Sequence, residues 1–399
     1  MITRRQQEWV ATMDGHVDGH VDGQLDGQVV GHGRDSVDGD RPAFVVAHRS
    51  SPPPTVRART VHREAREELE AATLSPGATL AHGAGRRARP EAPDAARTCF
   101  ERDRDRILHA TAFRRLAGKT QVFVFPADHQ RTRLTHALEV AQVAAAVARA
   151  VGLNVALTEA IALGHDCGHG PGGHASEDAF DRFLTGGYHH AQWGADVVLA
   201  PLNLCAETLD GIRNHSWSRP TPATPEGAVV SWADRIAYSA HDLEDAVSAG
   251  IVDPTDLPAE VVDVLGPTRR RQLSALIAAL VDGTSATGVV GMAAPEAEAL
   301  AALRRFNYER IYDRPASVAQ GRAVVSVLSA LVEHLAANPH LLPSDARPAT
   351  GDGVPEDDPV TAAVTYVAGM TDRFAFDTAV RLLDWPTERL PRGIDSPRS

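Results

Sequence analysis

Lysine is almost absent from this sequence of 399 residues, and cysteine is scarce. Lys119 is the only lysine, so arginine carries nearly all the positive charge, a bias typical of a GC-rich genome. The three cysteines, Cys99, Cys167 and Cys205, are odd in number, widely spaced and without a C-x-x-C pair. This pattern argues against both a disulfide framework and a thiolate zinc site, and favours buried cysteines in a reducing compartment.

Long apolar runs are missing as well. No segment approaches the roughly 20 consecutive apolar residues of a membrane span, and the N-terminal segment MITRRQQEWVATMDGH lacks the apolar region of a secretory signal. We therefore expect a cytoplasmic protein without a membrane partner. The net charge of −12 disfavours a dedicated nucleic-acid-binding protein, which is usually basic. Nucleic acid is thus not expected as the main partner, whereas an anionic small substrate needs only a local group of cations.

The first 60 residues differ in composition from the rest of the chain. Residues 12–40 repeat Asp-Gly at irregular short intervals, and Pro52, Pro53 and Pro54 follow. Such a segment buries too little apolar surface to offset the entropy lost on ordering. We therefore predict a disordered low-complexity extension over residues 1–60.

Helical periodicity dominates the remainder of the chain. Apolar residues recur every three or four positions in most segments, which indicates helices with one buried face. The clearest of these segments are 136–152, 158–166, 228–247, 271–283, 321–337 and 360–383, with a short polar helix at 61–74. Period-two alternation is rare, and QVFVF at 121–125 is the best strand candidate. The pattern predicts an all-α fold.

The densest group of chemically active side chains is GHDCGHGPGGHASE at 164–177. His165 and Asp166 end a predicted helix that Thr158 would cap, His136 lies near the start of an earlier helix, and Asp234 lies beside an apolar stripe of a later one. A buried carboxylate without a partner is costly, and a cation removes that cost. Two imidazoles and two carboxylates from three helices suit Mn, Mg, Fe, Co, Ni or Zn.

The alternative to metal binding is that His136 is an ordinary surface histidine and Asp234 a surface charge. Against it stands the pattern H…HD…D, which resembles the metal-binding signature of the HD superfamily. Further blocks resemble the deoxyguanosinetriphosphate triphosphohydrolase-like family, in particular its shorter bacterial type. These blocks are residues 97–123, 131–142, 157–180, 211–227, 232–251 and, more weakly, 366–375.

The resemblance implies a helical HD bundle with additional C-terminal helices. We expect an N-terminal helical segment at 61–128 that packs on an HD metal-binding core at 129–250, and a C-terminal helical region at 251–399 with a loop near 344–359. Each site would hold one divalent metal ion, Mn or Mg first, with Fe, Co, Ni or Zn as alternatives. The substrate would be a dNTP, dGTP or another, and relatives imply a homo-oligomer. Whether a second dNTP acts as an allosteric activator is left open by the sequence.

The resemblance also assigns four residues to catalysis. His174 and Glu177 are spaced i, i+3 and share a face at a helix start. A carboxylate that fixes an imidazole tautomer provides a general base for water or a general acid for the departing 5′-oxygen. His169 and His190 correspond to active-site histidines of the family. The alternative for Glu177 is a favourable position in the first turn of a helix.

Phosphate and sugar contacts follow from the same resemblance. Arg133 and Arg235 would contact phosphates, for which the planar guanidinium is suited. Tyr238 would pack on the deoxyribose and exclude a 2′-hydroxyl, with core-edge packing as the alternative. Asp242 would help to hold the sugar or phosphate site.

Three further residues are assigned to substrate binding on thinner grounds. Lys119 and Gln121 lie in the block AGKTQVF, and Gln192 matches a recurrent family position. Ala117 departs from the family, because many relatives carry a polar residue there, and this puts sugar recognition in doubt. Cys167, between Asp166 and Gly168, replaces the usual Leu or Ile and changes only the packing volume.

Two other functions compete with dNTP hydrolysis. One is another HD phosphohydrolase, acting on nucleoside monophosphates, (p)ppGpp or cyclic dinucleotides; the blocks outside the metal site argue against it. The other is a nucleotide-sensing or single-strand-binding protein without catalysis. The intact ligand pattern and the intact His174–Glu177 pair argue against such a loss.

Overall fold

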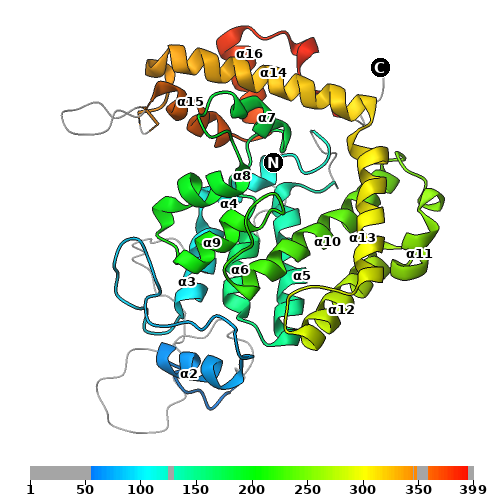
Figure 1. Cartoon of the computed structure of the whole chain (residues 1–399). Coiled ribbons are helices and arrows are strands. Elements are labelled where there is room, and N and C mark those ends of the chain that lie inside the picture. Colours follow the sequence, from blue (N-terminus) through cyan, green and yellow to red (C-terminus); the bar gives the residue numbers. More distant parts are fainter. Residues whose placement is uncertain (1–54, 125–129, 345, 348–357, 394–399) are drawn as a thin grey trace, which may run out of the picture. The chain divides into compact units, whose positions relative to one another are not determined.

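The computed structural model describes residues 55–124, 130–344, 346–347 and 358–393 (Figure 1). The chain divides into two units, Met1–Thr60 and Val61–Ser399. Residues 1–54 of the extension predicted to be disordered at 1–60, and most of the loop predicted near 344–359, lie outside the described residues. The account below concerns the second unit.

The described part of the second unit is all-α, as predicted. Its α-helices are α2 (Arg63–Thr73), α3 (Cys99–His109), α4 (Thr111–Arg115), α5 (Arg133–Val151), α6 (Val155–Gly164), α7 (Ala175–Asp181), α8 (His190–Trp193), α9 (Ala206–Asn214), α10 (Pro225–Ser248), α11 (Ala259–Leu265), α12 (Arg269–Thr287), α13 (Ala294–Asn307), α14 (Pro315–Ala337), α15 (Pro359–Ala368) and α16 (Asp372–Leu383). Within the described residues, β-pairing is confined to two isolated bridges, Arg87 with Cys205 and Thr120 with Thr132.

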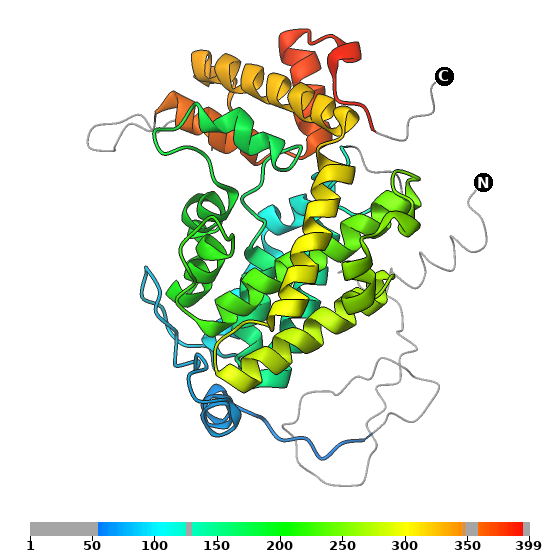
Figure 2. The same cartoon turned by 45° about the vertical axis from the view of Figure 1, so that its right-hand side comes forward.

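Two hydrophobic cores organise these helices. In the first, α5, α6 and α10 pack together, with α3, α9 and α11 to α13 around them. Ile107, Ile161 and Ile236 are fully buried there, and each such side chain stabilises the fold by roughly 1.5–3 kcal/mol. The second core joins α14, α15 and α16 to α7, a short helix that the chain reaches directly after α6 (Figures 1 and 2).

Local signals set the ends of the site helices. Thr98 and Glu101 form a capping box at the start of α3. The predicted cap Thr158 is wrong: α6 begins earlier, and the Asn154 side chain accepts from the backbone N–H of Leu157. Thr158 lies inside the helix, where its hydroxyl donates to the carbonyl of Asn154. Asparagine is the stronger N-cap, so it determines the boundary.

The strand predicted at 121–125 is also wrong for its described part. Residues 121–124 form bends, and pairing stops after the single bridge at Thr120. Phe123 is buried in the first core and Val124 in the second. The apolar character of the segment therefore reflects a crossing between two cores, not the two faces of a strand.

The last predicted helix, 360–383, is divided. α15 ends at Ala368, and α16 begins at Asp372 after the backbone of Thr371 turns to an extended conformation. Met370, in the link between the helices, is buried in the second core. Helical periodicity on both sides of a short break cannot be told from one continuous helix.

Among the described residues, α14 is the helix that meets the length and composition of a membrane span, with a mean hydropathy of 1.3. A core helix passes the same test. Val324, Val327 and Leu331 of α14 are fully buried in the second core against α7, α15 and α16. Its apolar face thus has partners within the fold.

Candidate functional site

The four residues predicted as metal ligands lie together in the first core. His136 comes from α5, His165 and Asp166 directly follow α6, and Asp234 comes from α10. The Nε2 atom of His136 is 3.1 Å from Oδ1 of Asp234 and 3.9 Å from Oδ2 of Asp166. The Nε2 atom of His165 is 3.4 Å from Oδ1 of Asp166 and 3.8 Å from Oδ1 of Asp234. The helices therefore bring two imidazoles and two carboxylates to one point.

This donor set fits a single divalent cation. Metal–ligand bonds of about 2.0–2.2 Å place ligand atoms on one ion about 3–3.5 Å apart, close to the distances observed. His165 is fully buried and its Nδ1 donates to the carbonyl of Ala162 at 2.6 Å. Its Nε2 faces the carboxylates and makes no hydrogen bond within the described structure. A backbone carbonyl behind a ligating histidine fixes the ring and its tautomer in this way.

Both carboxylates are held in the ionised form. Burial alone would raise the pKa of Asp166, but the neighbouring His165 and Arg133 lower it well below its usual value. Burial would likewise raise the pKa of Asp234, and the hydrogen bond from His136 together with the charge of Arg235 lowers it. Ionised oxygens of this kind are the ligands that a divalent cation requires.

Two arginines flank the cage formed by these four residues. Nη1 of Arg133 donates to Oδ2 of Asp166 at 2.7 Å, and Nη1 of Arg235 donates to Oδ2 of Asp234 at 2.8 Å. Among the described residues, Nε and Nη2 of Arg133 and Nε of Arg235 are buried without a hydrogen-bond partner. Buried unpaired donors are costly, and a phosphate oxygen would satisfy them.

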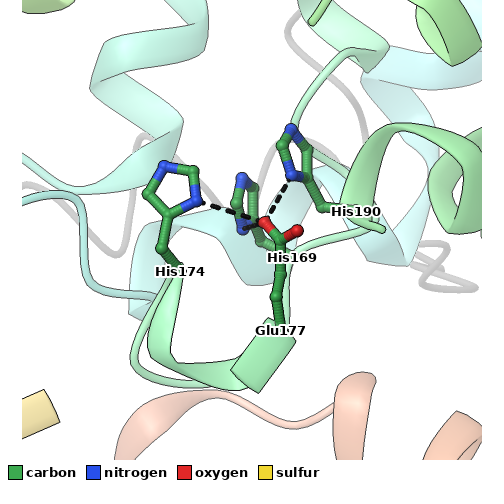
Figure 3. A group of neighbouring side chains, drawn as sticks. All are labelled: His169, His174, Glu177 and His190. Atoms are coloured by element: carbon green, nitrogen blue, oxygen red, sulfur yellow. Dashed lines mark hydrogen bonds and ion pairs between the residues drawn. The ribbon is translucent and has the colours of Figure 1, made fainter. Parts of the chain in front are cut away.

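A second cluster, which contains the four predicted catalytic residues, surrounds the carboxylate of Glu177 (Figure 3). Oε1 of Glu177 is 2.6 Å from Nδ1 of His190, 3.1 Å from Nδ1 of His174 and 3.8 Å from Nδ1 of His169. The rings of His169 and His190 stack with centroids 3.7 Å apart. Nε2 of His169 reaches Oδ1 of Asp166 at 3.2 Å, so the two clusters touch.

Exposure distinguishes His174 from the other histidines of this cluster. Its side chain is 76% exposed, whereas His169 and His190 are buried. Burial would raise the pKa of Glu177, but hydrogen bonds with His174 and His190 lower it well below its usual value. Burial also depresses the pKa of His169. The cluster therefore presents one accessible imidazole whose tautomer an ionised carboxylate can fix.

His215 belongs to the site, although no role was predicted for it from the sequence. It follows the last residue of α9, and its Nδ1 donates to the carbonyl of Ile212 at 2.8 Å. Its Nε2 lies 3.3 Å from Nε2 of His190, and its ring meets that of His165 edge-on. The available signal was a histidine one residue beyond a helix end, the same placement as His165.

Two other residues predicted to bind the substrate, Lys119 and Asp242, form hydrogen bonds with other protein groups. Lys119 is buried and donates to the carbonyls of His169 and Ala368. Asp242 accepts from Arg131 and from the Tyr312 hydroxyl.

Gln121 and Gln192 differ in exposure. Gln121 is half-buried, and its Oε1 has no hydrogen-bond partner among the described residues, while Gln192 is exposed on α8. The structure therefore leaves both as predictions from the resemblance.

No role was predicted from the sequence for Trp217 either, an aromatic residue next to Arg235. The guanidinium of Arg235 lies 4.9 Å from the ring centre of Trp217, and that of Arg304 lies 5.2 Å from it. Arg304 donates to the Tyr238 hydroxyl at 2.6 Å, and Trp217 is half-exposed. Arg304 comes from α13, far away in the sequence, so spacing alone offered no signal.

Comparison with known families matches two models to this chain. The HD domain model covers residues 133–239, which contain all four predicted ligands and the cluster around Glu177. The phosphohydrolase-associated domain model covers residues 290–381, from the end of the link after α12 to α16.

Individual relatives extend the likeness over most of the chain. Deoxyguanosinetriphosphate triphosphohydrolase-like proteins from Caldanaerobacter subterraneus and Deinococcus radiodurans are 40% and 38% identical, over 78% and 79% of this chain and 93% and 98% of their own lengths. A solved structure of a hypothetical protein from Aquifex aeolicus aligns at 16% identity with a TM-score of 0.44, over 69% of this chain and 67% of that one. The chain belongs to the deoxyguanosinetriphosphate triphosphohydrolase-like family of HD phosphohydrolases.

Proposed function

We propose that this chain hydrolyses deoxynucleoside triphosphates to a deoxynucleoside and inorganic triphosphate, in a reaction that depends on one divalent cation. The observation that carries the proposal is the pair of buried, incompletely bonded guanidiniums beside the cage. Arg133 and Arg235 each bond one of the two carboxylates of the cage and keep further N–H donors available. Positive groups on two sides of a cation site suit a polyphosphate.

His136, His165, Asp166 and Asp234 would hold the cation. When bound, a divalent ion supplies charge neutralisation at a phosphoryl oxygen and lowers the pKa of a coordinated water. The family favours Mn or Mg, and the N/O donor set also accepts Fe, Co, Ni or Zn.

His174 is the proposed proton donor. In the reaction, the oxygen of water bonds to the α-phosphorus and gives up one proton, the bond from that phosphorus to the 5′-oxygen breaks, and the 5′-oxygen gains one proton, so that no proton is gained or lost overall. The Nδ1 of His174 faces Glu177, and the ring is exposed, so its Nε2 is free to meet a substrate atom. Glu177 and the buried His190 hold the ring for that transfer.

Tyr238 is the proposed determinant of the deoxy sugar. It lies one helical turn after Asp234 on α10, and its hydroxyl is engaged by Arg304. A ring fixed in this manner can fill the space that a 2′-hydroxyl would need. Trp217, whose ring lies near the guanidiniums of Arg235 and Arg304, is partly exposed and offers an aromatic surface nearby for the base.

Product analysis tests the proposal directly. Purified protein is incubated with each dNTP and with GTP in Mn²⁺ or Mg²⁺, and the phosphate product is identified by anion-exchange chromatography. We expect tripolyphosphate and a deoxynucleoside, and much slower turnover of GTP. Orthophosphate or pyrophosphate would indicate another HD phosphohydrolase, and tight dNTP binding without turnover would indicate a binding protein; either outcome refutes the proposal.

A further inference from the structure

The catalytic turn, residues 169–174, depends on a carboxylate from the other end of the chain. It connects His169 to His174 through Gly170, Pro171, Gly172 and Gly173. Gly172 and Gly173 have φ angles of +72° and +65°, in the left-handed region that favours glycine. The turn is closed locally by the bond from the Gly173 N–H to the carbonyl of Gly170 at 3.3 Å and by the Ser176 hydroxyl, which accepts from the Gly170 N–H and donates to the carbonyl of Gly173. These bonds fix the shape of the turn, whereas its position relative to the rest of the site is set by the segments that it touches.

Asp372, the first residue of α16, holds the middle of this turn. Its Oδ1 accepts from the backbone N–H of Gly172 at 2.8 Å. Its Oδ2 accepts from the backbone N–H and the hydroxyl of Thr120 at 2.9 and 2.5 Å. Asp372 is 3% exposed, so these bonds are made away from water.

The surrounding contacts form a joint between residues 115–120 and the link 368–372. Lys119 donates to the carbonyl of Ala368 at 3.0 Å and also to that of His169, the first residue of the catalytic turn. Arg115 donates to the carbonyl of Gly369 at 3.0 Å. Gly118 lies so close to Thr371 that a Cβ atom there would fall 2.9 Å from its Cγ2.

The joint also touches the phosphate side of the site. The backbone N–H of Arg133 donates to the carbonyl of Lys119 at 3.3 Å. A Cβ atom on Gly173 would lie 2.8 Å from Nη2 of Arg133 and 3.1 Å from the carbonyl of Thr120. The catalytic turn, Arg133 and the joint are therefore packed in direct contact, and a shift of one displaces the others.

We infer that Asp372 is a positioning residue: it fixes the catalytic turn against Thr120, so that His169 and His174 keep their places beside the metal cage. The phosphohydrolase-associated region at 290–381 thereby completes the active site of the HD domain. The catalytic part of this inference rests on the proposed function, because it assumes that His174 acts on the substrate.

Asp372→Asn tests the inference with almost no change in shape. An amide has one acceptor oxygen, so in either orientation an NH₂ group faces a backbone N–H donor of Gly172 or Thr120. We expect kcat to fall about 10- to 100-fold, as for small misplacements of catalytic groups, with KM much less affected and bound metal unchanged. Amide hydrogen exchange over residues 165–177 should become faster.

Asp358→Asn is the matched control. Asp358 caps α15 in the same region, where its side chain accepts from the backbone N–H of Val360, and it is exposed. This variant should keep wild-type kcat and wild-type exchange in the catalytic turn. If Asp372→Asn fails to fold, Thr120→Val removes only one hydroxyl donor and should lower kcat in the same direction by less.

Four outcomes distinguish the inference about Asp372 from the proposed function. Wild-type kcat in a folded Asp372→Asn protein, or a kcat loss matched by Asp358→Asn, overturns the inference. Unchanged exchange of the catalytic turn in Asp372→Asn overturns it whatever the substrate is. A wild-type protein that hydrolyses no dNTP refutes the proposed function instead, and faster exchange in Asp372→Asn then still establishes the anchor.

Discussion

The two halves of the site are built in different ways. The metal cage stands on α5, α6 and α10, three helices that pack against one another in the first core. The cluster around Glu177 stands on a glycine-rich turn and two short helices, α7 and α8, and is anchored by polar contacts to the joint near Asp372. The first half is positioned by packing among long helices, whereas the second combines the apolar packing of α7 against α14 with a few buried hydrogen bonds to its glycine-rich turn.

This difference suggests how the halves respond to change. Apolar packing spreads over many side chains, so the cage tolerates the loss of any single distant contact. The turn depends more on single bonds, such as the one from the N–H of Gly172 to Asp372, so the loss of one of them should move it. Mutations can therefore separate loss of metal from loss of rate.

The largest effect is expected for Asp234→Ala. Removal of a carboxylate ligand should abolish both bound metal and dNTP hydrolysis, while α10 stays helical because alanine favours helices. Metal content by atomic spectroscopy and triphosphate release measure the two losses. Asp282→Ala, on the exposed side of α12, should change neither; full activity of metal-replete Asp234→Ala would contradict the assignment of the cage.

His174→Ala should affect the second half of the site alone. We expect kcat to fall by about 10²–10⁴, the usual contribution of a positioned acid or base, with bound metal retained. His109→Ala, at an exposed position on α3, serves as the control. Parallel loss of metal and rate would show that the two halves are not separable.

Gly172→Ala probes the catalytic turn directly. A left-handed φ costs a non-glycine residue about 1–2 kcal/mol, and the added Cβ would lie 2.4 Å from Cγ1 of the buried Val324. We expect a lower melting temperature and at least about a tenfold lower kcat, with metal retained. Gly321→Ala on α14 meets nothing within 4 Å and should be neutral; equal behaviour of the two variants would argue against a strained turn.

Lys119 is expected to contribute to stability in a pH-dependent way. Burial lowers its pKa from 10.5 to about 8. Between pH 8 and 10.5 the unfolded chain holds a proton on this amine that the folded chain has released. The free energy of unfolding therefore rises with pH over this interval, and the gain is lost as the pH falls back to 8. Relative to Lys119→Met, the wild type should gain up to about 3 kcal/mol between pH 8 and 10.5, measured by urea unfolding. A pH-independent difference would contradict a buried ammonium group.

Part of the site was visible in the sequence because its residues are close together along the chain or lie on strongly periodic helices. His165, Asp166, His169, His174 and Glu177 fall within 13 consecutive residues, 165–177. His136 required the resemblance to the HD pattern, and the local signal for Asp234 was its place beside an apolar stripe. The structure brings these side chains into contact.

Other parts were not visible because they arise from contacts between distant segments. No role was predicted from the sequence for His215, Arg304 or Asp372. Lys119 was assigned to the substrate because it is the only lysine and lies in the AGKTQVF block, and nothing in the sequence indicated that its ammonium group bonds two main-chain carbonyls. The role of such a side chain depends on how deeply it is buried and on which groups it bonds. Both are decided by chain segments up to about 250 residues away.

The amino-acid order by itself determined the helical class, through apolar residues spaced for one buried face, and the family, through motifs that keep their ligand chemistry. Only the tertiary structure decided which segments, distant from one another in the sequence, come into contact. The link 368–372 sits against residues 115–120 and the catalytic turn because two separate cores pack side by side there, and only that packing removes Asp372 from water and gives it partners.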